Sequence, residues 1–236
     1  SEMCIRDRLY AGPYTAEGWQ VTDAGEKDVV PPAADAKAGW QHVGAAWYHV
    51  KGEQALKREN CLEPRSVLRF RLAWRERLAV NIALNADFSS PAEAEKKEER
   101  PLFGNAWVLN MYQTYFSLNR TGYHRDGKAL DDRSQHAPSS VRLPENGEAE
   151  FELRMDRERG MLLLYIDGAY AAQWEQLEAL DDKGESINQP LGSGFALHCP
   201  TAKMPLCFSE CLITQWNGLR DSCLLYTSDA ADEEDS

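Results

Sequence analysis

Alternation of apolar and polar side chains is the dominant pattern of this chain. Between Ser66 and Arg75, leucine, phenylalanine and tryptophan occupy every second position, and arginines fill most of the others. A period of two places successive side chains on opposite faces of a strand, so this run predicts a strand with one buried face. Leu78–Asn85 alternates in the same way after the dipeptide Glu76-Arg77. Two such runs separated by two residues predict a β-hairpin.

The same pattern recurs towards the C-terminus. Glu148–Met155 alternates, Met161–Ile166 is an almost continuous apolar run, and Ala169–Trp174 follows Asp167-Gly168. Because Asp-Gly is typical of tight hairpin turns, these runs predict three consecutive antiparallel strands. Further strands are expected at 40–50, 55–58, 105–113, 114–120, 194–199 and 206–216. In the last of these a change of parity at Ser209-Glu210 predicts a β-bulge.

These runs amount to about ten to twelve strands and no firm helix. Most neighbouring runs are joined by turns of hairpin length, which predicts antiparallel pairing, and alternation requires one face of each sheet to be covered. The predicted fold is therefore all-β, an antiparallel two-sheet β-sandwich of the jelly-roll, concanavalin A-like kind. No internal repeat has a fixed period, which argues against a propeller or a solenoid.

The two ends of the chain differ from the rest. Ser1–Arg8 and Asp221–Glu233 resemble translated sequencing adapters, so they are not expected to belong to the fold. The whole chain of 236 residues has a formal charge of −12. Residues 221–236 hold six acidic and no basic residues and the first eight are neutral, so −6 remains on residues 9–220. This balance disfavours binding to nucleic acid or to an anionic membrane surface.

Three segments are expected along the chain. Residues 1–39 form an adapter-like head and an irregular leading segment with several prolines and glycines, residues 40–218 form the β-sandwich, and residues 219–236 form a disordered adapter-like tail. No apolar run approaches the ~20 residues of a membrane helix, so no membrane insertion is expected. The natural N-terminus is expected to be missing, together with neighbouring domains of the same polypeptide.

The order of several motifs resembles a known family. Phe70–Arg75 is followed by Gly104–Leu109, by the hairpin around Leu164–Gly168, by Gly192–Leu197 and by Ile213–Gly218. This order resembles the concanavalin A-like, laminin-G-like sandwich domains of exported planctomycete and verrucomicrobial proteins. It is more distantly similar to the 3-keto-disaccharide hydrolase-like family. The resemblance covers about residues 40–218, and it implies a location outside the cell, in the periplasm or at the cell surface. It also implies that the Asp-Gly hairpin and the two closing strands build one sheet.

Aromatic residues are the leading candidates for ligand binding. The candidates lie on two consecutive predicted strands and are Trp107, Tyr112 and Tyr115. Bulky side chains occupy both faces of these strands, so not all three can be buried. An exposed aromatic ring can stack on the face of a sugar, whereas a core position is the alternative for each residue. Arg71 lies on an outward face with Arg69 and Arg75. It could bind an anionic sugar, although cross-strand pairing with Glu150 and Glu152 is favoured.

Catalytic and metal-binding residues are not assigned. Glu148, Glu150 and Glu152 share one face at ~7 Å spacing, but they fit the solvent side of a strand, and the Glu-x-Asp-x-x-Glu motif of related glucanases is absent. The five histidines show no metal-binding spacing. Loop acids Asp126, Asp131 and Asp132 could bind calcium, although a solvated loop is favoured.

Four cysteines remain once the two ends are set aside: Cys61, Cys199, Cys207 and Cys211. Their spacing fits no zinc site, and small buried hydrophobic residues are the favoured interpretation. A bridge from Cys199 to Cys207 or Cys211 stays open.

The leading hypothesis is a non-catalytic binding module of a larger exported protein, with carbohydrate as its ligand class. The alternatives are a glycoside-acting hydrolase of the 3-keto-disaccharide hydrolase type and a structural spacer.

Overall fold

The structure is a computed structural model that describes residues 8–22, 29–30, 39–52, 54–89, 102–113, 115–131, 134–137, 139, 141–200 and 204–218. Within these residues it contains sixteen strands and no helix, and hence no helix that could cross a membrane. The tail 219–236, most of the adapter-like head, the charged run 91–100 and Asp132 lie outside the described residues.

The first sheet has the strand order β14-β13-β12-β7-β16-β5-β4, and β1 pairs with β16 in addition. Every pairing in it is antiparallel. Its strands are β1 (Arg8–Gly12), β4 (Trp40–Val43), β5 (Ala46–His49), β7 (Arg65–Trp74), β12 (Gly147–Asp156), β13 (Met161–Ile166), β14 (Ala169–Trp174) and β16 (Leu206–Gln215).

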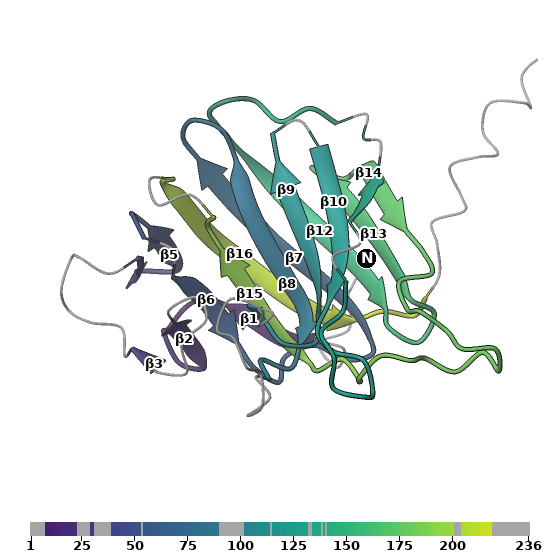
Figure 1. Ribbon diagram of the computed structural model, residues 1–236. Helices are drawn as coiled ribbons and strands as arrows, with labels where there is room; N and C mark the ends of the chain where they lie inside the picture. Colours follow the sequence, from purple (N-terminus) through teal and green to yellow (C-terminus); the bar gives the residue numbers. More distant parts are fainter. Residues whose placement is uncertain are drawn as a thin grey trace, which may run out of the picture.

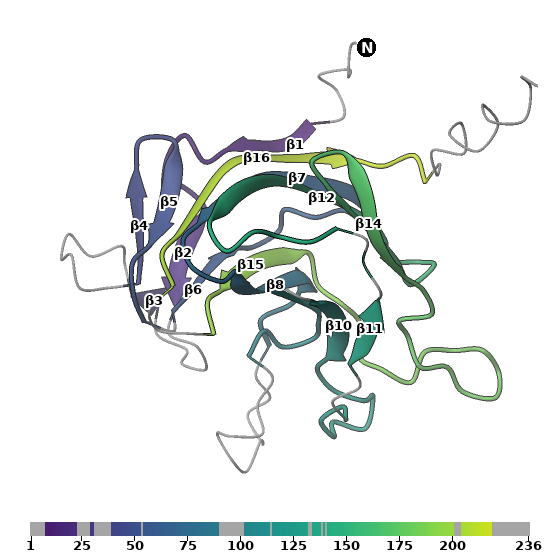
Figure 2. The same ribbon diagram turned by 90° about the horizontal axis from the view of Figure 1, so that it is seen from above.

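The second sheet has the order β11-β10-β9-β8-β15-β6-β2-β3 and is also antiparallel. Its strands are β2 (Trp19–Thr22), β3 (Val29–Val30), β6 (Ala55–Arg58), β8 (Ala79–Ala86), β9 (Ala106–Tyr112), β10 (Tyr115–Thr121), β11 (Gln135–Ala137) and β15 (Gly194–His198). The two sheets lie face to face (Figure 1), and the view from above shows the first sheet curving around the second (Figure 2).

The core lies between the two sheets and consists of the apolar side chains on the inward face of each strand. Phe70 stacks on Phe151 within the first sheet, with ring centroids 5.7 Å apart, and Phe195 of the second sheet lies 5.9 Å from Phe208 of the first. All four rings are fully buried, as are Leu68, Ile82 and Leu153. Burial by period-two alternation therefore builds this fold, and the predicted antiparallel two-sheet sandwich is confirmed.

The predicted hairpin across Glu76-Arg77 is wrong. β7 belongs to the first sheet and β8 to the second, so this turn carries the chain from one layer to the other. In a hairpin the apolar faces of both strands would lie side by side in one sheet. Here they face each other across the core, with Phe70 on one side and Ile82 on the other. Both arrangements produce the same alternation, which is why the pattern alone did not separate them.

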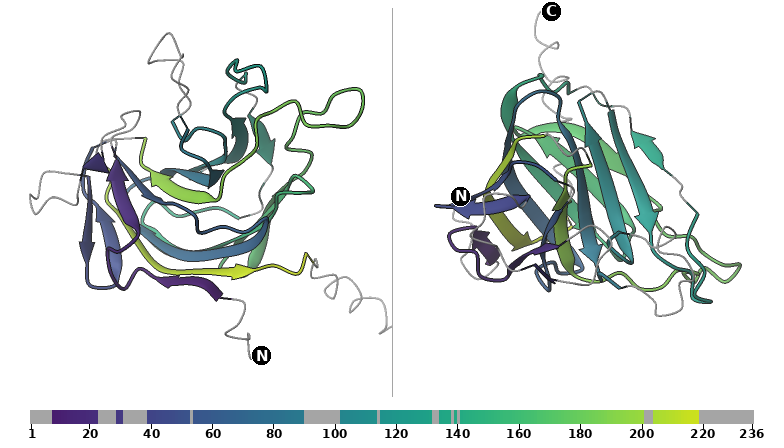
Figure 3. Two further views of the ribbon diagram at one scale, coloured as in Figure 1. Left: turned by 90° about the horizontal axis from the view of Figure 1, so that it is seen from below. Right: turned by 60° about the vertical axis from the view of Figure 1, so that its left-hand side comes forward.

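Two further expectations need correction. The segment expected to be an irregular leader contains β1 and β2, which pair with β16 and β6, so regular structure is already present well before residue 40. The two closing strands, β15 and β16, lie in different sheets. Figure 3 shows from below that β1 runs beside β16 at the outside of the first sheet.

The predicted turn and bulge are confirmed. Asp167 and Gly168 both have positive φ, 49° and 77°, as a tight hairpin turn with the twist of its strands requires. The register of β16 against β7 shifts between Ser209 and Leu212, and Glu210 has φ of 51°. Before this bulge β16 pairs with β5, and after it with β1, so the bulge gives the strand two partners along one edge.

Candidate functional site

A pocket of about 710 Å³ lies at one end of the sandwich, where two turns and a loop meet. It is lined by Glu76, Arg77, Leu78, Ala79, Tyr112, Gln113, Tyr115, Glu145, Asn146 and Met204. These residues come from the β7–β8 crossing, the β9–β10 hairpin and the segments just before β12 and β16. Since β12 and β16 belong to the first sheet and β8–β10 to the second, the pocket is built by both layers.

Two stacked tyrosines form one wall of this pocket. Tyr112 and Tyr115 are directly opposed in the β9–β10 register, their ring centroids are 5.0 Å apart, and their planes are inclined by 27°. Tyr115 is 44% exposed, and His136 of β11 lies against its ring at 5.7 Å. Burial, and to a lesser degree the neighbouring Tyr115, raises the pKa of Tyr112. The pair is therefore an aromatic wall of the pocket that solvent can reach.

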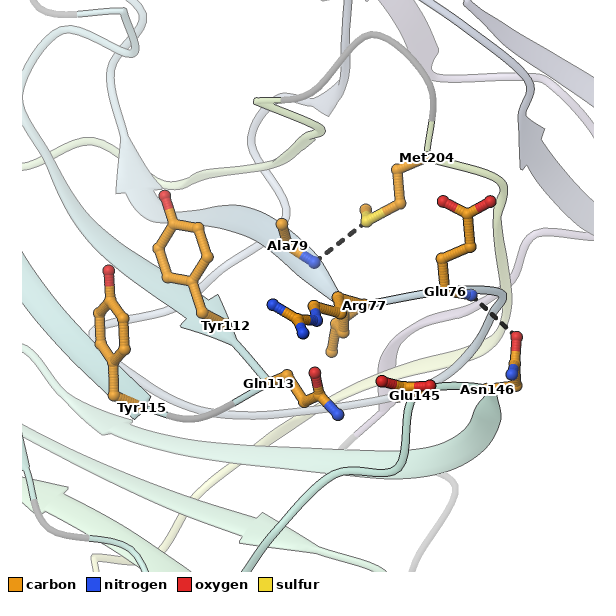
Figure 4. Close-up of a pocket in the computed structure, with 10 residues that line it drawn as sticks. Glu76, Arg77, Ala79, Tyr112, Gln113, Tyr115, Glu145, Asn146 and Met204 are labelled. Atoms are coloured by element: carbon orange, nitrogen blue, oxygen red, sulfur yellow. Dashed lines mark hydrogen bonds between the residues drawn. The ribbon is translucent and has the colours of Figure 1, made fainter.

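Charged and amide groups lie across from the tyrosines. Figure 4 shows the guanidinium of Arg77 directed toward the tyrosine side, with Glu145 on the far side of the pocket and Gln113 between it and the tyrosines. The β7–β8 crossing that carries Arg77 is fixed by a hydrogen bond of 2.9 Å from the Glu76 backbone N–H to Oδ1 of Asn146. The pocket thus offers both donors and acceptors beside an apolar surface, as sites for small polar ligands do.

The Met204 wall is held in place from two sides. Its Sδ accepts a hydrogen bond from the backbone N–H of Ala79 at 3.0 Å (Figure 4). Its carbonyl oxygen lies 2.6 Å from Nδ1 of the buried His49. The second ring nitrogen of His49 lies 2.9 Å from the carbonyl oxygen of Gly52. His49 therefore ties the chain before β16 to the loop after β5.

A polar row continues along the same face of the second sheet as the tyrosines. The register places His198, Asn81, Asn110 and Ser117 side by side on β15, β8, β9 and β10. Asn81 Nδ2 lies 3.4 Å from Nδ1 of His198, and Asn110 Nδ2 donates to Oγ of Ser117, also at 3.4 Å. Because Tyr112 and Tyr115 are two residues from Asn110 and Ser117, their side chains share this outer face.

The structure brings together two of the four predicted ligand-binding residues, Tyr112 and Tyr115. Trp107 is fully buried in the core, and its Nε1 lies 3.4 Å from Oε1 of Glu178. A ring in that position offers no face to a ligand, because its parity on β9 is the inward one. Trp107 therefore drops out as a stacking platform.

Arg71 lies on the outer face of the first sheet, away from the tyrosine pocket. Its Nε is 3.2 Å from Glu210, and its Nη1 is 3.8 Å from Glu148. The hydrogen bond and charge of Glu210 raise the pKa of Arg71. The register pairs Glu150 with Arg71 and Glu152 with Arg69. The cross-strand pairing favoured for these arginines and glutamates is present.

Sequence reasoning missed most of the pocket. The sequence predicts only a tight turn at Arg77, and no motif surrounds the other pocket residues, which lie in loops or at strand ends: Gln113, Glu145, Asn146 and Met204. The sequence signal for this pocket is the polar character of the β7–β8 and β9–β10 turns. Placing these two turns side by side requires knowing that β7 and β8 belong to opposite sheets.

The described part of the chain contains no group of three His, Cys, Asp or Glu side chains arranged for a metal. Asp126, one of the loop acids considered for calcium, instead accepts a hydrogen bond from the backbone N–H of Lys128, and this contact lowers its pKa. Cys61, Cys199, Cys207 and Cys211 are free thiols, so the bridge from Cys199 is not formed.

No protein-family model and no curated protein matches the sequence. Several solved structures share the fold. The exoplasmic domain of VIP36, bound to calcium and Man3GlcNAc, has a TM-score of 0.52 at 11% identity, with 92% of each chain covered. A candidate glycosyl hydrolase from Parabacteroides distasonis has a TM-score of 0.52 at 8% identity, covering 85% of this chain and 89% of that one.

A Bacillus subtilis protein of unknown function with a galectin-like fold has a TM-score of 0.51 at 13% identity, covering 89% of this chain and 96% of that one. At such low identity these likenesses show the fold alone, and that fold is the expected concanavalin A-like sandwich.

Proposed function

We propose that this chain is a carbohydrate-binding module and that the tyrosine pocket is its binding site. The observation that carries the proposal is the stacked Tyr112–Tyr115 pair on the wall of a pocket that also holds Arg77, Gln113 and Glu145. The C–H face of a pyranose packs on an aromatic ring, and its hydroxyls need several donors and acceptors at the rim. The pocket combines both.

The structural neighbours support this ligand class. One was solved with Man3GlcNAc bound, and another is a candidate glycosyl hydrolase. We propose further that the module is non-catalytic, that it belongs to a larger exported protein, and that it acts outside the cell, in the periplasm or at the cell surface. The sugar-bound neighbour is an exoplasmic domain, which supports such a location.

The decisive experiment is a glycan array followed by calorimetry with the best hit. Tyr115→Ala removes the exposed half of the platform and should weaken binding by about five- to tenfold. Tyr170→Ala is the matched control, because Tyr170 is an exposed tyrosine of β14 in the other sheet. An array without a reproducible hit, or equal losses in the two variants, contradicts the proposal.

Glycoside hydrolysis is the second candidate, because two carboxylates, Glu76 and Glu145, line the same pocket. A pair of carboxyl groups flanking one bond is what glycoside hydrolysis requires. Turnover of glycosides by the intact chain, lost in both Glu76→Gln and Glu145→Gln but kept in Glu148→Gln, would favour the enzyme over the binding module.

A further inference from the structure

The rim of the tyrosine pocket carries an Asn-Gly dipeptide. Asn146 lines the pocket and is exposed, and Gly147 is the first residue of β12. The printed sequence has one other such pair, Asn217-Gly218. In an Asn-Gly pair the backbone nitrogen of the glycine can attack the amide carbon of the asparagine side chain, because glycine has no side chain to hinder the ring that forms. The chain can therefore react with itself at this rim.

The structure adds an activating contact to this pair. The backbone N–H of Glu76 donates to Oδ1 of Asn146 at 2.9 Å (Figure 4). Attack on an amide carbon moves negative charge onto the amide oxygen, and a fixed backbone N–H directed at that oxygen stabilises the charge. Glu76 lies in the short crossing between β7 and β8, which ties it to both sheets. The Glu76 N–H therefore occupies the position of an oxyanion donor for a reaction at Asn146.

The leaving group and the reacting water are unobstructed as well. Among the residues that the structure describes, none holds Nδ2 of Asn146 by a hydrogen bond. Asn85, Asn105 and Asn188 are instead buried, with exposed fractions of 4% or less, so their amides are shielded from water. Asn146 thus combines an exposed amide, a polarised carbonyl and a glycine neighbour.

We propose that Asn146 is a modification site, at which the folded chain converts asparagine to aspartate and isoaspartate. The Gly147 backbone nitrogen gives its proton to a solvent base and forms a bond to Cγ of Asn146. The Cγ–Nδ2 bond then breaks, and Nδ2 takes up a proton and leaves as ammonia, which gives a succinimide ring. Water adds to one of the two ring carbonyl carbons and breaks the bond from that carbon to the ring nitrogen. Water is the only co-reactant, and nothing is oxidised or reduced.

Either product changes the pocket. Aspartate places a further negative charge in a pocket that already holds Glu76 and Glu145. Isoaspartate also lengthens the main chain by one carbon where β12 begins, which displaces the acceptor of the Glu76 N–H. That hydrogen bond fixes the crossing that carries Arg77. The modification therefore lowers the affinity of the pocket for sugar, a consequence that rests on the proposed function, whereas the reaction at Asn146 does not.

Incubation of the full chain at neutral and mildly alkaline pH tests the proposal. Peptide mass spectrometry follows the conversion of amide to acid at each asparagine, and isoaspartate is measured in the same peptides. We expect Asn146 to convert faster than the buried Asn85, Asn105 and Asn188. Its conversion should be at least as fast in the folded chain as in urea, because only the folded chain has the Glu76 donor. The rate should rise with pH, since attack requires loss of the proton from the glycine nitrogen.

Asn146→Gln is the matched variant, because it keeps an amide but needs a larger ring for the same attack. Conversion at this position should be lost in the variant, while conversion at Asn217 is unchanged. Protein aged in this way should bind the best sugar of the array about two- to fivefold more weakly than fresh protein, and Asn146→Gln should show no such loss on ageing.

No conversion at Asn146, conversion only in urea, or equal ammonia release from Asn146→Gln would overturn the proposal. A chain that binds no sugar still gives the mass readout, so this proposal and the proposed function fail separately.

Discussion

At the scale of single residues, His49 is the most constrained polar side chain near the tyrosine pocket. Both of its ring nitrogens lie within hydrogen-bond distance of backbone carbonyl oxygens, 2.6 Å from Met204 and 2.9 Å from Gly52. A carbonyl only accepts, so a ring nitrogen that carries a hydrogen donates it to the carbonyl beside it. The ring also packs 5.2 Å from that of Trp40.

Replacing His49 should therefore be costly. His49→Leu removes the ring's hydrogen bonding to this pair of carbonyls and leaves a buried polar group unsatisfied, and we expect the free energy of unfolding to fall by about 2–4 kcal/mol. Urea denaturation measures this loss. His42→Leu is the control, since His42 is half-buried and has one carbonyl contact, of 3.2 Å to Pro13, so its loss should be about 1 kcal/mol. Equal losses in the two variants would contradict the role given to His49.

At the scale of elements, strands were predictable and some of their partners were not. Period two located β7, β8 and β12, because burial on one face depends only on local sequence, and a continuous apolar run located β13. The hairpin at Asp167-Gly168 was predictable too, since its dipeptide has a conformational meaning of its own. The β7–β8 crossing was not predictable, because the sheet to which each of these strands belongs depends on its pairing with strands that come later in the sequence.

The same limit applied to the candidate site. Tyr112 and Tyr115 were found because they belong to one hairpin and are neighbours in sequence. Trp107 was not excluded, because both parities of β9 carry bulky side chains. Arg77 and Met204 are 127 residues apart in the printed sequence and meet only through the packing of two sheets.

The β7–β8 crossing offers its own test. Glu76 has φ of 65°, a left-handed conformation that asparagine adopts more readily than glutamate does. We expect Glu76→Asn to raise the free energy of unfolding by about 0.5 kcal/mol, because it relieves part of this strain. Glu145→Asn is the control, an exposed loop position without positive φ, and should change stability less. A destabilised Glu76→Asn would contradict the strain argument.

At the scale of the whole molecule, the cysteines connect burial with pH. Burial raises the pKa of Cys61 and of Cys199 to about 12, from an ordinary value of 9.0. Burial raises that of Cys211 as well. The unfolded chain releases these protons at lower pH than the folded chain does. The contribution of these thiols to stability is therefore complete below pH 9 and is lost as pH rises toward 12.

Under reducing conditions, the free energy of unfolding should fall between pH 9 and pH 12 by about 1.4 kcal/mol per pH unit for each buried thiol. Denaturation curves at several pH values measure this slope. Cys199→Ala should reduce the slope by the share of one thiol, whatever its effect on stability at pH 7. An unchanged slope in that variant would show that the alkaline loss has another source.

Arg77 lies on the turn between β7 and β8, which connects the two sheets. The rest of the same pocket is lined by residues from loops of both sheets. A sugar bound there would contact both sheets of the sandwich at once. Ligand binding would then also resist mechanical separation of the two sheets, so a module of this kind would withstand force best while its ligand is bound.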